Sequence, residues 1–313
     1  MDLIADIGAT NTRCALLDDR GDVVATEHFV NSEFADLGSL LTAYLQRRQD
    51  SDQPRDAALA IAAPVHDDEV RMININWSFS QASLREQLRL SRLLMCNDFE
   101  AIARGLPDLV RDDLQQVGAG LEAARATKVV LGPGSGLGVA GLVPGAETWT
   151  VASGEGGHVT MAPIDDEEAQ ILKLMRETVG HCSAERLLSG PGLVNLYWAV
   201  GQLHGVEADK VQPEQVMTLA DQGDPLALSA RQHFFAMLGT IAGNLALTMG
   251  ARGGVYIAGG IVPDCVEQFR ESKFRERFES KGRYRRYLQE IPSYVITRPE
   301  PAFVGLRRFL GYC

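Results

Sequence analysis

The chain has 313 residues, a length more typical of two domains than of one. Apolar residues make up 45% of it and charged residues 23%, an ordinary balance for a globular protein. The formal net charge of -11 argues against nucleic acid or an anionic membrane as the main partner, because both attract basic surfaces. An anionic nucleotide is still allowed, since it needs only local N–H groups and a metal ion.

The five cysteines are scattered and form no C-x-x-C pair, which fits buried thiols in a reducing cytosol and does not fit a zinc site. The N-terminus lacks a basic segment followed by a long apolar run, so we expect no signal peptide and a cytoplasmic location. Residues 232–251 contain no Asp, Glu, Lys or Arg, but they include His233, Asn244 and three glycines, which favours a buried helix over a membrane span.

The first residues predict a strand, a turn and a strand, at 3–7, 8–12 and 13–17, followed by a strand at 23–29 and a helix at 34–46. A strand at 57–62, a helix at 83–90 and a strand at 93–96 come next. A helix at 99–106 is expected to stop at Pro107, and we place a domain boundary at Pro107 and Asp108.

A second strand–turn–strand unit is predicted at 128–131, 132–138 and 139–143. It resembles the unit at the N-terminus, and this weak internal repeat suggests two related halves. The later predicted elements are helices at 166–178, 184–188, 192–203, 225–249 and 264–278, and a strand at 255–258.

The first turn carries polar residues that suit a phosphate site. Gly8 allows the backbone to approach a phosphate, and Thr10 and Asn11 can donate hydrogen bonds to its oxygens. Asp6 can hold Mg²⁺ through water, because this ion keeps several of its waters. The alternative is an ordinary hairpin with polar turn residues.

The second glycine turn, 132–138, contains the pattern G-x-G-x-x-G over 136–141. A dinucleotide fold needs that pattern to open a helix, and the residues that follow here favour a strand and a turn. We therefore reject a dinucleotide-binding fold. The chain also lacks the P-loop pattern G-x-x-x-x-G-K-[ST].

Two further segments bring carboxylate, amide and imidazole groups. Asp98 can be a helix N-cap, or a general base that takes the proton of a sugar hydroxyl, with Asn97 bonding a neighbouring hydroxyl. Glu155 and His158 lie among three glycines and can be presented to a ligand by a tight loop, although a solvated turn is the alternative. Glu185 can be either the first turn of a helix or a third polyol ligand. Together, the segments suggest a kinase that phosphorylates a sugar hydroxyl.

These segments resemble bacterial glucokinase of the proteobacterial type, within the hexokinase–actin–chaperone ATPase superfamily. The resemblance covers nearly the whole chain, and its most specific parts are 154–159, 183–193 and 253–261, supported by 97–99 and by Asn74 with Trp77. It implies an α/β fold, specifically a two-domain actin-like ATPase (ribonuclease H-like) fold with an interdomain cleft. The expected domains are 1–108 plus 298–313, and 109–297.

The resemblance also implies roles for individual residues. It makes Asp98 the catalytic base that deprotonates the 6-hydroxyl of glucose, and Asp6 a magnesium site acting through water. The implied sugar ligands are Asn97, Glu155, His158, Glu185 and Asn74. The implied ATP-binding residues are Ala5, Asp6, Ile7, Gly8, Ala9, Thr10, Asn11, Gly134, Ser135, Gly136, Gly259 and Gly260.

The expected function is therefore ATP-dependent and Mg²⁺-dependent phosphorylation of glucose, without zinc, by a homodimer that binds neither nucleic acid nor membrane. Ser135 stands where the family usually has Thr, and 299–306 lacks the usual Gly/Ala-rich run, which bears on the choice of phosphoryl donor. The alternatives are a broader hexose or glucosamine kinase, a non-catalytic sugar-sensing protein, and an ATPase that binds partners. A DNA-binding regulator would need a further module, for which the residues before Leu3 leave no room.

Overall fold

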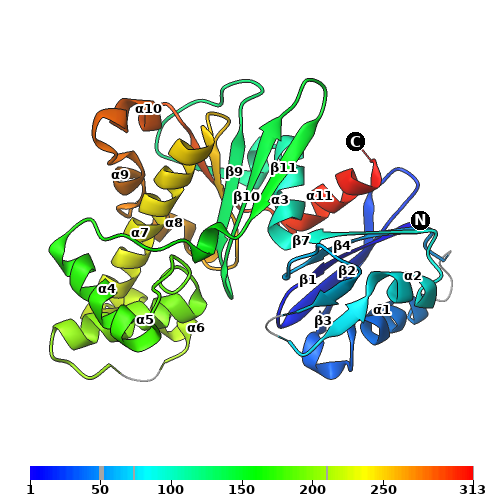
Figure 1. Cartoon of the computed structure of the whole chain (residues 1–313), viewed down its shortest axis with the longest axis horizontal. Coiled ribbons are helices and arrows are strands. Elements are labelled where there is room, and N and C mark those ends of the chain that lie inside the picture. The colour runs from blue at the N-terminus through cyan, green and yellow to red at the C-terminus, as the bar shows by residue number, and fades with distance from the viewer. Residues whose placement is uncertain (49–52, 73–74, 209–210, 313) are drawn as a thin grey trace. The chain divides into compact units, whose positions relative to one another are not determined.

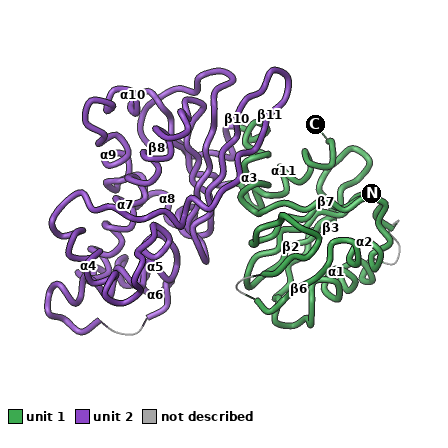
Figure 2. The backbone as a smooth tube through the Cα atoms, viewed as in Figure 1, with its two compact units in different colours: residues 1–110, 298–313 green, residues 111–297 purple. Residues whose placement is uncertain are grey.

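The computed structural model describes the chain except residues 49–52, 73–74, 209–210 and 313. The chain forms two compact units, residues 1–110 with 298–313 (unit 1) and residues 111–297 (unit 2), shown in green and purple in Figure 2. Each unit contains its own mixed β-sheet and its own helices (Figure 1).

Unit 1 has a five-stranded sheet in the order β3-β2-β1-β4-β7. β1 pairs antiparallel with β2 and parallel with β4, which in turn runs parallel to β7. The strands are β1 (Asp2–Ile7), β2 (Asn11–Leu17), β3 (Val23–Val30), β4 (Asp56–Ile61) and β7 (Arg92–Asn97), and a small hairpin joins β5 (Glu69–Arg71) to β6 (Ser78–Ser80).

The helices of unit 1 are α1 (Leu37–Gln46), α2 (Gln81–Gln87), α3 (Asp98–Gly105) and α11 (Pro301–Leu310). Apolar runs explain the strands: all five residues 57–61 are fully buried. α1 begins at a capping box, in which the Asp36 carboxylate accepts from the Ser39 N–H. α11 packs on α3 and returns the end of the chain to unit 1.

Unit 2 has a six-stranded sheet in the order β11-β10-β9-β12-β13-β8. Its strands are β8 (Leu114–Val117), β9 (Lys128–Pro133), β10 (Leu137–Pro144), β11 (Trp149–Gly154), β12 (Val255–Ile257) and β13 (Ser293–Ile296). Its helices are α4 (Asp166–Val179), α5 (Gly190–Leu203), α6 (Pro213–Asp221), α7 (Pro225–Met249), α8 (Val266–Arg270), α9 (Phe274–Glu279) and α10 (Arg285–Gln289).

The two sheets share one strand plan. In each, a hairpin is followed by a third antiparallel strand, and two parallel strands add on the other side, giving β3-β2-β1-β4-β7 and β11-β10-β9-β12-β13. The parallel pairs need crossover connections, which contain the helices. This shared plan matches the internal repeat seen in the sequence.

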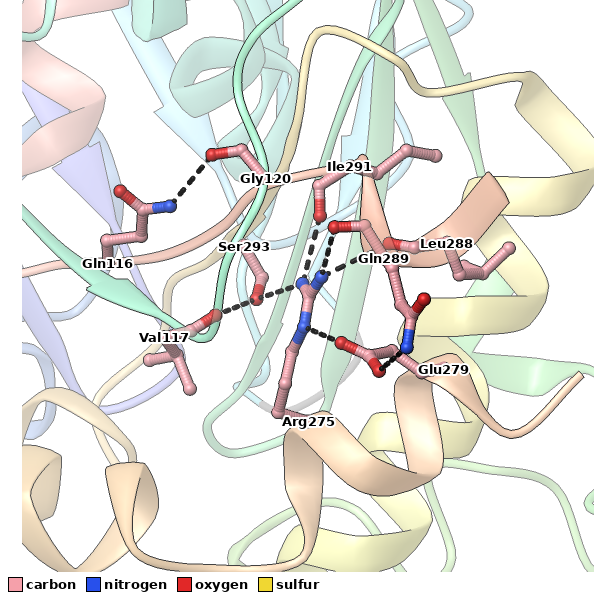
Figure 3. A network of polar contacts seen from close by, with 9 residues as sticks. All are labelled: Gln116, Val117, Gly120, Arg275, Glu279, Leu288, Gln289, Ile291 and Ser293. Carbon is pink, nitrogen blue, oxygen red and sulfur yellow. Dashed lines mark hydrogen bonds and ion pairs between the residues drawn. The ribbon is translucent and has the colours of Figure 1, made fainter. Parts of the chain in front are cut away.

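A polar network holds the amino end of β13, which is the opposite end of this strand from Ile296 (Figure 3). The Arg275 guanidinium donates to the carbonyl oxygens of Leu288, Gln289 and Ile291 at 2.9–3.2 Å, and so anchors the segment that joins α10 to β13. It also pairs with Glu279, at 2.7 Å. These contacts fasten a part of the sheet that carries none of the predicted site residues.

Two predicted helices are wrong. Residues 184–188 form a turn, because this segment is held by hydrogen bonds to neighbouring loops. The predicted helix 264–278 is divided into a short 3-10 turn (Pro263–Cys265), α8 and α9. The helix predicted at 225–249 is confirmed as α7, which is buried over residues 234–243, within the stretch expected to be a buried helix. Across the described residues, no helix is both long and apolar enough to span a bilayer.

Candidate active site

In unit 1, the sheet topology brings two of the predicted segments to one edge. β1 and β7 both run parallel to β4, which lies between them, so their carboxyl ends share an edge of the sheet. The turn after β1 contains Gly8 to Thr10, and Asn97 and Asp98 follow β7 directly. Ligands of open α/β sheets bind outside the carboxyl ends of strands, so this edge is a candidate site.

The turn after β1 is organised by a residue that the sequence reasoning missed. The Gly8 N–H donates to the Asn11 carbonyl oxygen at 3.0 Å, which closes the turn. The fully buried Asn31 side chain donates to the Gly8 carbonyl oxygen at 2.9 Å, and its backbone N–H donates to the Thr10 carbonyl oxygen at 2.9 Å. Asn31, the residue directly after β3, thus holds the turn.

The helix after β7 begins one residue earlier than predicted, and its N-cap is Asn97. The Phe99 N–H is shared between Asn97 Oδ1 at 3.0 Å and Asp98 Oδ1 at 2.9 Å. Asp98 is therefore the first helical residue, and the interpretation of Asp98 as the N-cap is wrong. The Asn97 amide oxygen is engaged as the cap, and its amide nitrogen donates a long hydrogen bond of 3.5 Å to the Ile61 carbonyl oxygen.

Two carboxylates at this edge have altered proton affinity. Burial raises the pKa of Asp98 to about 7, reinforced by the negative charge of Asp6 and opposed by the hydrogen bond from the Phe99 N–H. Burial also raises the pKa of Asp6, while the nearby Arg13 lowers it. Asp98 thus has a proton affinity suited to a base working near neutral pH.

Asp6 belongs to a row of ionisable side chains across three strands. Asp6, Arg13 and His28 occupy facing positions on β1, β2 and β3. Arg13 lies 3.5 Å from Asp6, and Glu300, just before α11, lies 3.9 Å from Arg13 and 3.3 Å from His28. Sequence reasoning gave Arg13, His28 and Glu300 no role, although the hairpin register could have paired Arg13 with Asp6.

In unit 2, the second glycine turn and the Gly259–Gly260 turn also share an edge. β9 and β12 are parallel neighbours, and the turns follow their carboxyl ends. Within the turn after β9, the Gly134 N–H donates to the Gly136 carbonyl oxygen at 2.8 Å, and Ser135 is exposed at the tip. The exposed hydroxyl and backbone of this turn can bind a phosphate.

The predicted sugar ligands of unit 2 lie together. His158 Nε2 is 3.9 Å from Glu155, and His158 Nδ1 is 3.9 Å from Glu185. The Glu155 and His158 side chains are 68% and 57% exposed, whereas Glu185 is 28% exposed. The structure therefore gathers three polar groups, two carboxylates and an imidazole, that can bond several hydroxyls of one polyol.

The remaining predicted residues differ in what they can contribute. Ala5 and Ile7 are fully buried in β1, so their side chains belong to the core of unit 1, whereas Ala9 is half-buried in the turn and Asn11 is exposed. Asn74 lies outside the described residues. In the described part of the chain, no three His, Cys, Asp or Glu side chains gather into a metal-binding group.

The sequence and fold of this chain are similar to those of known proteins. The glucokinase family model matches residues 3–311. A glucokinase of Paramagnetospirillum magneticum is 44% identical over 308 residues, covering 98% of this chain and 96% of that protein. The "Bifunctional protein glk" of Burkholderia pseudomallei is 42% identical over 99% of this chain, but the chain spans only 48% of that longer protein.

A crystal structure of glucokinase from an Antarctic psychrotroph superposes with a TM-score of 0.87, at 32% identity, covering 99% of this chain and 98% of that one. The match confirms the predicted α/β fold class. Because the family match and the relatives extend over nearly the whole chain, the protein belongs to the glucokinase family, whose members are sugar kinases.

Proposed function

We propose that this protein transfers the γ-phosphoryl group of ATP to the 6-hydroxyl of glucose and so forms glucose 6-phosphate. Membership of the glucokinase family supports the reaction type. The observation that carries the proposal is the Asp98 carboxyl, placed at the carboxyl end of β7, with its pKa raised to about 7 by burial.

Asp98 acts as the general base in this proposal. A sugar hydroxyl attacks poorly until its proton is removed, and a carboxylate with a pKa near the working pH can accept that proton as the attack proceeds. The hydrogen bond from the Phe99 N–H to Asp98 Oδ1 fixes the orientation of the carboxylate. Its other oxygen can then face the hydroxyl.

Glu155, His158 and Glu185 bind the sugar ring in this proposal, together with the Asn97 amide group. Carboxylates accept hydrogen bonds from hydroxyls, and an imidazole can donate or accept according to its tautomer. The two exposed side chains, Glu155 and His158, have room for a ligand.

The turns after β1 and β9 contact the phosphates, through the Thr10 and Ser135 hydroxyls and backbone N–H groups. Asp6 fits a magnesium ion that accompanies the nucleotide, because such an ion takes one or two protein carboxylates and keeps several waters. The burial of Asp6, which raises its pKa, suits a carboxylate that gains a cation on ligand binding. Bound magnesium would supply charge neutralisation to the phosphates.

The proposal is tested by a matrix of phosphoryl donors and sugars. ATP, ADP and polyphosphate are each combined with glucose, mannose and glucosamine, and sugar phosphate is measured with and without Mg²⁺. We expect the highest kcat/KM for ATP with glucose, and no sugar phosphate without Mg²⁺. Phosphate release at a rate that does not depend on added sugar would contradict the proposal. Equal rates with all three sugars would indicate a broader hexose kinase.

We further propose a cytoplasmic homodimer. Cys14, Cys96, Cys182 and Cys265 are all buried free thiols, which suits a reducing compartment. Analytical ultracentrifugation of the purified chain measures the oligomeric state, and a single species with the mass of one chain would contradict the dimer.

A further inference from the structure

Two segments of unit 2, the loop that contains Gly157 and the turn that contains Glu185, both approach the backbone of Leu137, the first residue of β10. The Leu137 N–H donates to Glu185 Oε2 at 2.9 Å. A Cβ on Gly157 would lie 2.1 Å from the Leu137 carbonyl oxygen, so residue 157 must be glycine for the loop to approach. The N–H and the carbonyl oxygen of Leu137 therefore both face segments that are proposed to bind the sugar.

Residues 134–136, between β9 and β10, form the turn proposed to bind phosphate, which is called the phosphate turn below. The segment 185–190 holds this turn at both ends. Glu185 binds it at Leu137, and the Gly190 N–H donates to the Gly134 carbonyl oxygen at 2.8 Å. The same segment is joined to the loop that contains His158, because the Glu185 N–H donates to the Gly157 carbonyl oxygen at 2.9 Å. The turn and the loop are thus connected through Glu185.

The two oxygens of Glu185 face different partners. Oε2 accepts from the Leu137 N–H, whereas Oε1 lies 3.9 Å from His158 Nδ1, which is longer than a hydrogen bond. A sugar hydroxyl can therefore donate to Oε1 while Oε2 keeps its bond to the turn. A methyl group at position 136 would displace this carboxylate, because a Cβ on Gly136 would lie 2.5 Å from Glu185 Oε2.

We propose that Glu185 couples the sugar site to the phosphate turn, by accepting a sugar hydroxyl on one oxygen and the Leu137 N–H on the other. Sugar binding orders the carboxylate and with it the turn, so sugar and nucleotide bind more tightly together than alone. Such coupling is reciprocal: each ligand raises the affinity of the other by the same factor. This inference rests on the proposed function, in which these segments bind glucose and phosphate.

A purely structural role for the Leu137–Glu185 bond predicts a different behaviour. In that case Glu185 only stabilises the backbone of the turn. A substitution that disturbs the turn then changes stability or nucleotide binding without changing glucose affinity. The distinguishing measurement is therefore glucose affinity in the complete absence of nucleotide.

The experiment compares two alanine substitutions in the same turn. Gly136→Ala places a methyl group against the Glu185 carboxylate, whereas Gly134→Ala meets no atom within 4 Å, and neither position has a left-handed backbone. Isothermal titration of glucose, without nucleotide, is expected to give a Kd about tenfold higher for Gly136→Ala than for the wild type. Gly134→Ala should stay within about twofold, whatever its effect on the nucleotide.

Titration of a non-hydrolysable ATP analogue then measures the coupling directly. In the wild type, saturating glucose is expected to lower the Kd of the analogue, and in Gly136→Ala this change should largely disappear. If the wild type binds glucose and both alanine variants bind it equally well, the coupling is wrong although the proposed function stands. If the wild type binds no glucose, the proposed function fails and the inference fails with it.

Hydrogen exchange of the wild-type protein guards against a Gly136→Ala variant that does not fold. Glucose alone, without nucleotide, is expected to slow the exchange of the Leu137 N–H, because sugar binding fixes its acceptor. Unchanged exchange in peptides covering 134–140 at saturating glucose would overturn the coupling.

Discussion

The carboxylates proposed to act in unit 1 and in unit 2 have different surroundings. Asp98 and Asp6 lie at one sheet edge, where burial raises the pKa of both and the negative charge of Asp6 raises that of Asp98 further. Glu155 in unit 2 is 68% exposed and shares His158 with Glu185 at 3.9 Å. A group that must exchange a proton benefits from lost solvation, whereas a group that binds hydroxyls needs only access and geometry.

The shared strand plan makes this difference more informative. Both sheets place a glycine turn inside a hairpin and add parallel strands beside it, yet the proposed base follows a parallel strand, β7, in unit 1 only. In unit 2 the polar groups come from the loop after β11 and from the 185–190 segment. The same scaffold therefore carries different chemistry on different connections.

The largest expected effect is that of Asp98→Asn. The substitution removes the proton acceptor while keeping an oxygen for the Phe99 N–H and leaving the Asn97 cap intact. We expect kcat to fall at least about a hundredfold, with thermal stability and glucose affinity near those of the wild type. Steady-state kinetics, calorimetric melting and glucose titration measure the three quantities.

Asp108→Asn is the matched control for this substitution, because Asp108 is a more exposed carboxylate of unit 1 that pairs with Arg308 at 2.8 Å. It should keep wild-type turnover. Wild-type turnover in Asp98→Asn as well would show that the mechanism is wrong, and an unfolded variant would show that the Asp98 carboxylate is needed for folding.

The pH dependence of kcat/KM should show the same carboxyl group. Because the base must be deprotonated and its pKa is about 7, activity should be constant above that pH and fall about tenfold for each unit below it. An acidic limb centred near pH 4, the ordinary range of an aspartate, would contradict the effect of burial. Circular dichroism at each pH separates this loss from acid unfolding.

The sugar-binding groups should give smaller and more selective effects. His158→Ala and Glu185→Gln each remove or weaken hydrogen bonds of about 0.5–1.5 kcal/mol, so we expect the KM for glucose to rise up to about tenfold. The KM for ATP should change much less, since the amide introduced by Glu185→Gln keeps an oxygen for the Leu137 N–H. For His158→Ala, which leaves the Leu137–Glu185 bond in place, equal increases in both KM values would indicate a folding role.

The smallest effect is expected for Ser135→Ala. This exposed hydroxyl is proposed to bond one phosphate oxygen, so its loss should raise the KM for ATP a few-fold, within about 1 kcal/mol, and leave the KM for glucose unchanged. Ser135→Thr keeps the hydroxyl and is the control. A change in glucose KM alone would place Ser135 among the sugar ligands.

Much of the scaffold follows from local sequence. Apolar runs and glycine turns identified the strands that became β1, β2, β9 and β10, and the helix predicted at 225–249 became α7. Residues 184–188 were misread as a helix, because their favourable composition is overridden by backbone bonds to the neighbouring loop, such as that from Glu185 to Gly157.

By itself, the sequence determined which residue types stand after which strands, because strand periodicity, glycine turns and helix capping act over a few neighbouring residues. Only the tertiary structure decided what those residues experience. The pKa of Asp98 is raised by burial and by the charge of Asp6. Asn31 fixes the conformation of the turn at Gly8, and Glu185 supplies the hydrogen-bond acceptor of the Leu137 N–H. Desolvation, charge and hydrogen bonding act between groups that meet in space, so residues distant in the chain set the chemistry of a local motif.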